Sequence, residues 1–127
     1  MARTSVPAVS DFAEAVGYAR AVKAGRNVYV AGTAPVMPGD ADPPADAHGQ
    51  ARRCLEIIVD ALAELGSGPA DVVRTRIFLT RAGDIDEIGR AHAEVFRNVR
   101  PATTAVVVKA LLDPRWLVEI EADAVLP

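Results

Sequence analysis

The most constraining feature of this sequence is an alternating stretch close to its end, from Trp116 to Val125. Apolar and acidic residues occupy opposite parities along it: Val118, Ile120, Ala122 and Ala124 on one, and Leu117, Glu119, Glu121 and Asp123 on the other. Because successive side chains of a β-strand point to opposite faces of the sheet, this pattern predicts a strand with one buried and one acidic face. The three carboxylates either face solvent or meet another surface.

Four other stretches are predicted to be strands. Residues 17–24 and 27–31 flank a Gly-Arg-Asn turn and are close enough to form a hairpin. Residues 72–80 and 103–110 are rich in Val and Thr, which favour strands. Alternation within 72–80 gives two faces: Val73, Thr75, Ile77 and Leu79 on one, and Val72, Arg74, Arg76 and Phe78 on the other. Residues 1–15 show no clear element.

Two helices are predicted between these strands. Residues 48–65 carry apolar residues at helical spacing, and Gly66 follows as a C-terminal cap. Asp84 and Glu87 are predicted to form a capping box at the start of the second helix. The apolar stripes of the two helices are Ala51, Cys54, Leu55, Ile58, Leu62 and Leu65, and Ile85, Ile88, His92, Val95 and Phe96. The long loop at 34–47, rich in Pro and Asp, is either a lid or binding loop or a disordered excursion.

The predicted order is therefore β-β-α-β-α-β-β in a single α+β domain over residues 1–127. Two helices can cover only one face of a sheet. The other face mixes apolar residues with charged ones: Arg20, Arg74, Arg76, Lys109, Glu119 and Glu121. Such a face suits burial against other copies of the chain, so the sequence predicts a homo-oligomer.

Composition excludes several classes of protein. With 14 basic and 17 acidic residues the net charge is -3, so no nucleic-acid partner is expected. The single cysteine, Cys54, provides no disulfide framework and is compatible with a reducing cytoplasm. The sequence shows no signal-peptide run and no apolar stretch long enough to cross a membrane, which predicts a soluble cytoplasmic protein. His48 and His92 are not at metal-ligand spacing with Cys54, so no metal is expected.

The residues left for chemistry are polar side chains on the predicted strands. Glu119 can activate a water if burial raises its pKa toward neutrality. Arg20, Arg74 and Arg76 can each bind an organic carboxylate through two hydrogen bonds. Further polar groups are the phenol of Tyr18 and the hydroxyls of Thr33, Thr103 and Thr104. Structural salt links among these charges are the alternative interpretation.

Several segments match a known family in order and spacing over nearly the whole chain: GYARAV, VYVAGTAP, DVVRTRIFLT, AHAEVF, RPATTAVVV and LVEIEADAV. They resemble the Rid family, also called the YjgF or reactive intermediate deaminase family, which includes proteins described as endoribonuclease L-PSP. The resemblance implies a chorismate-mutase-like fold with one mixed sheet, and a homotrimer with a central barrel and a ligand cleft between neighbouring subunits. The best-known members hydrolyse imines and enamines to 2-keto acids and ammonia with no metal or organic cofactor.

The resemblance also implies roles for single residues. Glu119 matches the glutamate that positions the hydrolytic water, and Tyr18 and Gly32 match the family's tyrosine and glycine. Thr33 stands where the family has a glutamine. Thr103 directly follows Pro-Ala, where the active deaminases carry the arginine that grips the substrate carboxylate. The sequence thus keeps the water side of the cleft and lacks the usual anion anchor.

Two functions follow from this departure. The first is a hydrolase acting on an enamine, imine or related small metabolite other than 2-iminobutanoate, with Gly32, Thr103 and Thr104 holding its polar groups. In that case Arg20 and Arg76 are the candidates to replace the missing cation, and the sequence leaves the choice between them open. The second is a non-catalytic trimer that binds or senses a small molecule. RNA cleavage is the weakest interpretation, because neither a histidine pair nor a basic excess supports it.

Overall fold

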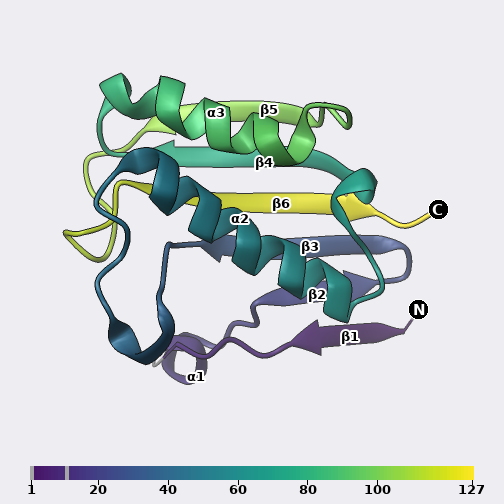
Figure 1. The fold of residues 1–127 in the computed structure, drawn as a ribbon. Coiled ribbons are helices and arrows are strands. Elements are labelled where there is room, and N and C mark those ends of the chain that lie inside the picture. The colour runs from purple at the N-terminus through teal and green to yellow at the C-terminus, as the bar shows by residue number, and fades with distance from the viewer. Residues whose placement is uncertain (1, 11) are drawn as a thin grey trace.

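The protein forms one six-stranded sheet with its helices packed on one side (Figure 1). The computed structural model describes residues 2–10 and 12–127. The strand order is β1-β2-β3-β6-β4-β5, and all neighbours are antiparallel except the parallel pair β4 and β5. The strands are β1 (Arg3–Val6), β2 (Ala21–Ala24), β3 (Asn27–Thr33), β4 (Val72–Leu79), β5 (Ala102–Val107) and β6 (Val118–Val125). The helices are α1 (Phe12–Val16), α2 (Ala47–Glu64) and α3 (Ile85–Phe96).

The predicted α+β class and mixed sheet are confirmed, with α2 and α3 on the same face of the sheet (Figure 1). The predicted order was incomplete, because β1 and α1 precede its first strand. β1 has four residues and is held by its antiparallel pairing with β2. α1 has five residues, none of them buried. Elements this short and exposed show no hydrophobic periodicity, so they could not be predicted from the residue pattern.

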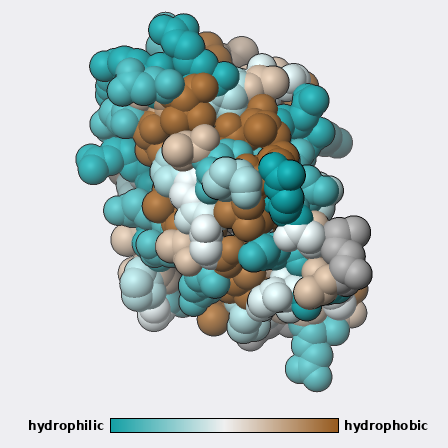
Figure 2. Space-filling model, turned by 90° about the vertical axis from the view of Figure 1, so that its right-hand side faces the viewer, coloured by the Kyte–Doolittle hydropathy of each residue, from teal (hydrophilic) through white to brown (hydrophobic). Residues whose placement is uncertain are grey.

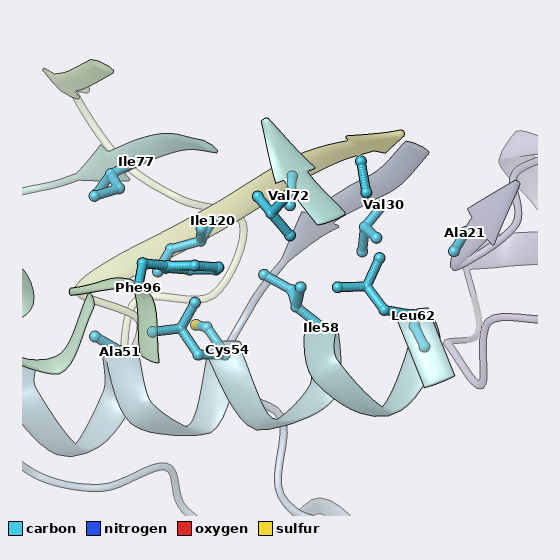
Figure 3. Close-up of a cluster of buried hydrophobic side chains, with 14 of the residues drawn as sticks. Ala21, Val30, Ala51, Cys54, Ile58, Leu62, Val72, Ile77, Phe96 and Ile120 are labelled. Atoms are coloured by element: carbon cyan, nitrogen blue, oxygen red, sulfur yellow. The ribbon is translucent and has the colours of Figure 1, made fainter. Parts of the chain in front are cut away.

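The core lies between the sheet and α2 (Figure 3). Every residue of the predicted apolar stripe of the first helix is buried, including Cys54 and Leu65. Asp46 caps the helix start by accepting a hydrogen bond from the Gly49 amide at 3.2 Å. At the other end Gly66 adopts a φ of 76°, as predicted for a C-terminal glycine. The alternation of β6 is also confirmed, with Val118, Ile120, Ala122 and Ala124 all buried.

Two register shifts interrupt the sheet. Beyond each shift, the odd-numbered and even-numbered residues of the strand exchange faces of the sheet. In β3 the shift against β6 falls between Val30 and Thr33, so both of these residues are buried. In β4 the shift falls between Val72 and Arg74. The predicted inward position of Val73 is therefore wrong: Val72 is buried, and Val73 is 49% exposed. A bulge adds one residue to one strand, which strict alternation cannot anticipate.

The start of α3 differs from the predicted capping box. Asp84 directs its carboxylate at the Arg81 side chain, with Oδ2 2.9 Å from Nε, and makes no capping hydrogen bond to the helix. A short 3₁₀ turn at Ala82–Asp84 leads into the helix instead. The aspartate still lies at the helix start, where its negative charge favours the N-terminal end of the helix dipole.

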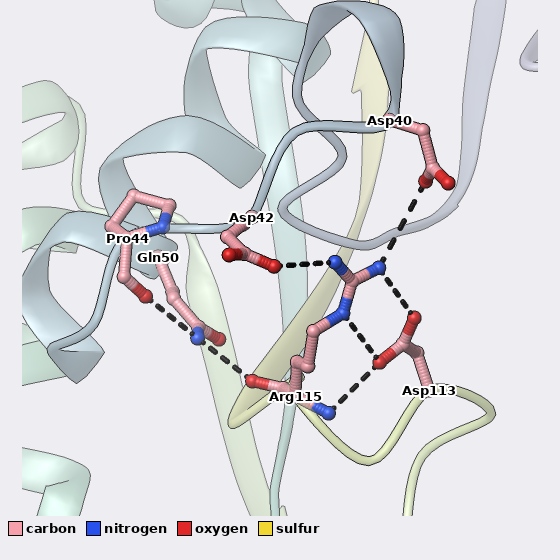
Figure 4. A network of polar contacts seen from close by, with 6 residues as sticks. All are labelled: Asp40, Asp42, Pro44, Gln50, Asp113 and Arg115. Atoms are coloured by element: carbon pink, nitrogen blue, oxygen red, sulfur yellow. Dashed lines mark hydrogen bonds and ion pairs between the residues drawn. The ribbon is translucent and has the colours of Figure 1, made fainter.

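The 34–47 loop is an ordered part of the fold (Figure 4). The buried Gln50 side chain donates from Nε2 to the carbonyls of Pro44 and Arg115, each at 2.9 Å. Its Oε1 accepts from the Leu117 amide at 2.7 Å. The exposed Arg115 guanidinium pairs with Asp42 at 2.9 Å. α2 and the segment before β6 thus hold the loop together, which argues against a disordered excursion.

Candidate active site

Glu119 lies beside the bulge of β3, on the face of the sheet that the helices leave open. It stands opposite Phe78 in the register of β4 and β6. A Cβ atom added at Gly32 would lie 3.2 Å from Oε2 of Glu119, so the carboxylate rests directly over this glycine. Burial raises the pKa of Glu119, Arg20 opposes the rise, and Glu121 adds to it. The half-buried Glu119 carboxyl group therefore keeps its proton up to a higher pH than an ordinary glutamate does.

Arg20 lies on the other side of the same glycine. Its Nη2 donates to the Gly32 carbonyl at 2.6 Å. Burial lowers the pKa of Arg20, while Tyr18 and Glu119 counteract the effect. No carboxylate in the described residues lies within 4 Å of its guanidinium. Tyr18, Arg20, Gly32 and Glu119 therefore form one electrostatic group, in which the cation and the carboxylate interact without an ion pair.

Arg76 is in a different situation. Its Nη1 lies 3.0 Å from Glu121 and 3.4 Å from Asp123, both on the same open face of the sheet. Two carboxylates already neutralise this guanidinium, as the structural interpretation of the charges predicts. Of the two arginines that the sequence offered as replacements, Arg20 is the one beside Glu119 and free of an acidic partner within the described chain.

The three threonines lie in separate places. Thr33 is fully buried and donates to the carbonyl of Ala31 at 2.8 Å, inside the bulge. Thr103 and Thr104 are exposed on β5, the edge strand, and β4 separates them from Glu119 on β6. Within one chain the predicted site residues therefore form two groups, one around Gly32 and one on the sheet edge.

A hydrogen-bonded chain that the sequence did not suggest ends at Thr103. His92 Nε2 lies 2.9 Å from Thr75 Oγ1, which lies 2.8 Å from Thr103 Oγ1. Thr103 in turn donates to the Pro101 carbonyl at 3.1 Å. Each hydroxyl has one proton to donate, so all three contacts are made only if His92 donates to Thr75 and Thr75 donates to Thr103. Burial lowers the pKa of His92, which favours the neutral ring. The hydrogen-bonded chain then requires that the one ring proton lie on Nε2.

This chain could have been foreseen only in part. The alternation of its strand predicts that Thr75 faces the helices, and His92 lies on the predicted apolar stripe of its helix. Both side chains were therefore expected in the core. A threonine and a histidine facing the same core need partners, but their pairing depends on the packing of α3 over β4. Thr103 therefore donates its proton within the protein and offers only acceptor capacity to a ligand.

The described residues hold no other obvious catalytic centre. No group of three or more His, Cys, Asp or Glu side chains among them could bind a metal ion. His48 pairs with Glu94 at 2.6 Å, whereas the half-buried His92 contacts Thr75. Burial raises the pKa of Cys54, which keeps its thiol protonated. Among the described residues, none of the helices has the length and apolar character needed to cross a membrane.

Comparison with known proteins agrees with this fold. The model of the family described as Endoribonuclease L-PSP matches residues 9–126. The chain belongs to this family. An L-PSP family member from Mycobacterium tuberculosis, titled a member of the YjgF/YER057c/UK114 family, has a crystal structure that superposes with a TM-score of 0.90. It is 45% identical and covers 98% of this chain and 100% of its own.

Two curated relatives bear on function to different degrees. An uncharacterized protein of Streptomyces coelicolor is 42% identical over 119 residues, covering 91% of this chain and 86% of its own length. The 3-aminoacrylate deaminase RutC of Acinetobacter baylyi is 37% identical over 108 residues, covering 84% of this chain and 85% of its own. Relatives of this chain within the L-PSP family thus include a named deaminase of a small enamine.

Proposed function

We propose that this protein hydrolyses an imine, enamine or related small metabolite, using a water molecule held by Glu119. The observation that carries the proposal is the half-buried Glu119 carboxylate resting over Gly32, with its pKa raised by burial and the Arg20 cation nearby. A general base works best when its pKa lies near the working pH. The relative named as a 3-aminoacrylate deaminase supports this class of substrate.

The reaction requires only water and one proton acceptor. An enamine first gains a proton on carbon and loses one from nitrogen, which gives the imine. Glu119 then accepts a proton from water as the water oxygen bonds to the imine carbon, and the C=N electron pair moves to nitrogen. Return of that proton to nitrogen gives a neutral aminol. The C–N bond breaks as the proton of the new hydroxyl group passes to nitrogen, with Glu119 as its carrier, which releases ammonia and leaves a carbonyl group. The chemistry needs no metal or organic cofactor.

The substrate is proposed to differ from 2-iminobutanoate because Thr103 stands at the arginine position. A neutral hydrogen bond contributes about 0.5–1.5 kcal/mol, against about 1.5–3 kcal/mol for one to a charged group. The Thr103 hydroxyl already donates its proton to the Pro101 carbonyl, so it cannot donate to a substrate carboxylate, which needs hydrogen-bond donors. Binding of a standard 2-imino acid through this position would be at least about tenfold weaker than with an arginine.

We propose a cytoplasmic homotrimer in which copies cover the open face of the sheet. Figure 2 views the molecule from the right-hand side of Figure 1, at the ends of the strands, where hydrophobic residues reach the surface in a broken band. Every residue of β5 is exposed, and Val106 on it is 44% exposed. If β5 of one copy lay against the Glu119 region of the next, Thr103 and Thr104 would join Tyr18, Gly32 and Glu119 in a cleft between subunits.

A second candidate is a trimer that binds or senses a small molecule without turning it over. The observation that favours it is again Thr103, because the family's carboxylate anchor is absent at this position. In this case a ligand would raise the melting temperature of the protein and be recovered chemically intact.

Ammonia release from 3-aminoacrylate and from 2-imino acids generated in situ tests both candidates. The comparison uses the wild type, Glu119→Gln and the matched control Glu121→Gln, which alters a neighbouring acid on the same face. The hydrolase predicts turnover of at least one substrate, lost in Glu119→Gln and kept in the control. Turnover that survives Glu119→Gln would rule out the mechanism. Stabilisation by a compound recovered unchanged would favour the binding protein.

A further inference from the structure

A cavity of about 330 Å³ lies against α2, on the helix-covered side of the sheet, and Arg20 lines it while Glu119 does not. Its walls come from α2, from the segment that follows β3 and from the segment that follows β1. Val36, Met37 and Ile57 make much of the lining apolar. The volume falls within the range of small-molecule sites in proteins. The described lining includes none of the residues matched to the family site, which are Tyr18, Gly32, Thr33, Thr103 and Glu119, so the hydrolytic site does not account for the cavity.

Among the described residues that line the cavity, the charged groups are the guanidiniums of Arg20 and Arg53 and the carboxylate of Asp60. Arg53 already donates from Nε to the Val36 carbonyl at 2.8 Å and lies 3.8 Å from Glu56. Arg20 makes one hydrogen bond, from Nη2 to Gly32, and its Nε is buried without a partner in the described chain. A buried charged donor without a partner is costly, so Arg20 is the group in this cavity that most requires an anion.

We propose that this cavity binds a small organic monocarboxylate, with its carboxylate on Arg20 and its apolar body against Met37 and Ile57. The described side chains that line the cavity carry a net charge of one positive unit, which matches a single negative charge on the ligand. Asp60 disfavours a second negative group. An inorganic anion would leave the apolar walls without a partner, whereas a short aliphatic or aromatic acid would cover them. This assignment does not depend on the proposed hydrolysis.

Binding of benzoate and butyrate to the full-length protein tests the proposal by NMR titration. The methyl signals of Ile57 and Met37 should shift in a saturable manner, while residues near Thr103 stay unchanged. Benzamide and butylamine, which share the apolar bodies but lack the carboxylate, should bind at least about tenfold more weakly, because a charged hydrogen bond is lost. Equal binding of benzamide, preference for butylamine, or shifts confined to Thr103 and the open face would each overturn the assignment.

Variants locate the charge that matters. Arg20→Gln should weaken benzoate binding at least about tenfold, and Arg90→Gln, a change at an exposed arginine of α3, should leave it unchanged. Asp60→Asn removes the repelling carboxylate from an exposed position and should tighten binding by about two- to fivefold. This second variant keeps the test decisive if Arg20→Gln fails to fold. If neither the Asp60→Asn variant nor the Arg20→Gln variant changed the affinity for benzoate, the proposal would be contradicted. If Arg20→Gln does not fold, unchanged affinity in Asp60→Asn is enough to contradict it.

Discussion

At the scale of single residues, Glu119 and Arg20 act on each other across Gly32 without forming an ion pair. Burial raises the pKa of Glu119, and the positive charge of Arg20 limits the rise. Arg20→Gln should therefore raise the pKa of Glu119 further. A base must be ionised to accept a proton, so the acid limb of the pH–rate profile should move to higher pH. Carbon-13 NMR titration of the Glu119 carboxyl group measures the shift, with Arg90→Gln as control. A pKa that stays constant or falls would show that Arg20 has no such influence.

A glycine is required at position 32 because the Glu119 carboxylate lies close to its Cα, and not because of its backbone angles. Its φ is not in the left-handed region, but a Cβ would lie 3.2 Å from Oε2 of Glu119. Gly32→Ala should displace the carboxylate by a fraction of an ångström and lower kcat by about ten- to a hundredfold, since misplacement of a catalytic group is costly. Gly89→Ala is the matched control, because nothing lies within 4 Å of its added Cβ. Equal rates in the two variants would remove Glu119 from its assigned place.

At the scale of elements, much of the fold could be predicted and its irregularities could not. The apolar stripe of α2 and the alternation of β6 each repeat several times. The buried face of such an element can therefore be predicted from its own residues, without knowledge of its neighbours. The bulges of β3 and β4 are single insertions, and the reversal at Val73 follows from pairing with β6. The proximity of Arg20 to Glu119 has the same origin, because it depends on where the bulge turns the Gly32 carbonyl. Sequence parity alone therefore left Arg20 and Arg76 equivalent.

Gln50 joins three elements through one buried amide, and its loss should affect the loop at 34–47 more than the core. Gln50→Leu leaves the Leu117 amide and the carbonyls of Pro44 and Arg115 without this partner. The free energy of unfolding should fall by about 2–4 kcal/mol, because unsatisfied buried polar groups cost about 1–3 kcal/mol each and some will be hydrated. Urea denaturation measures it. Arg115→Ala, which removes the exposed ion pairs of the same loop, should cost clearly less, and the reverse order would refute this account.

At the scale of the whole molecule, the sheet is covered by helices on one face only, and the candidate site is divided between Gly32 on one strand and Thr103 on the far edge. Both features have one explanation if copies of the chain pack through their open faces.

Val106 lies on the open face opposite Phe78 in register, and it is 44% exposed in the single chain. Val106→Lys should therefore shift the protein from trimer to monomer in sedimentation velocity, since an ammonium group is costly to bury without a partner. Ile85→Lys on α3, at a position 39% exposed on the helix side, should leave the proposed trimer intact. If clefts between subunits carry out the reaction, Val106→Lys should also lose ammonia release while each chain stays folded by circular dichroism. An active Val106→Lys monomer would instead place the whole reaction within one chain, around Glu119, Gly32 and Arg20.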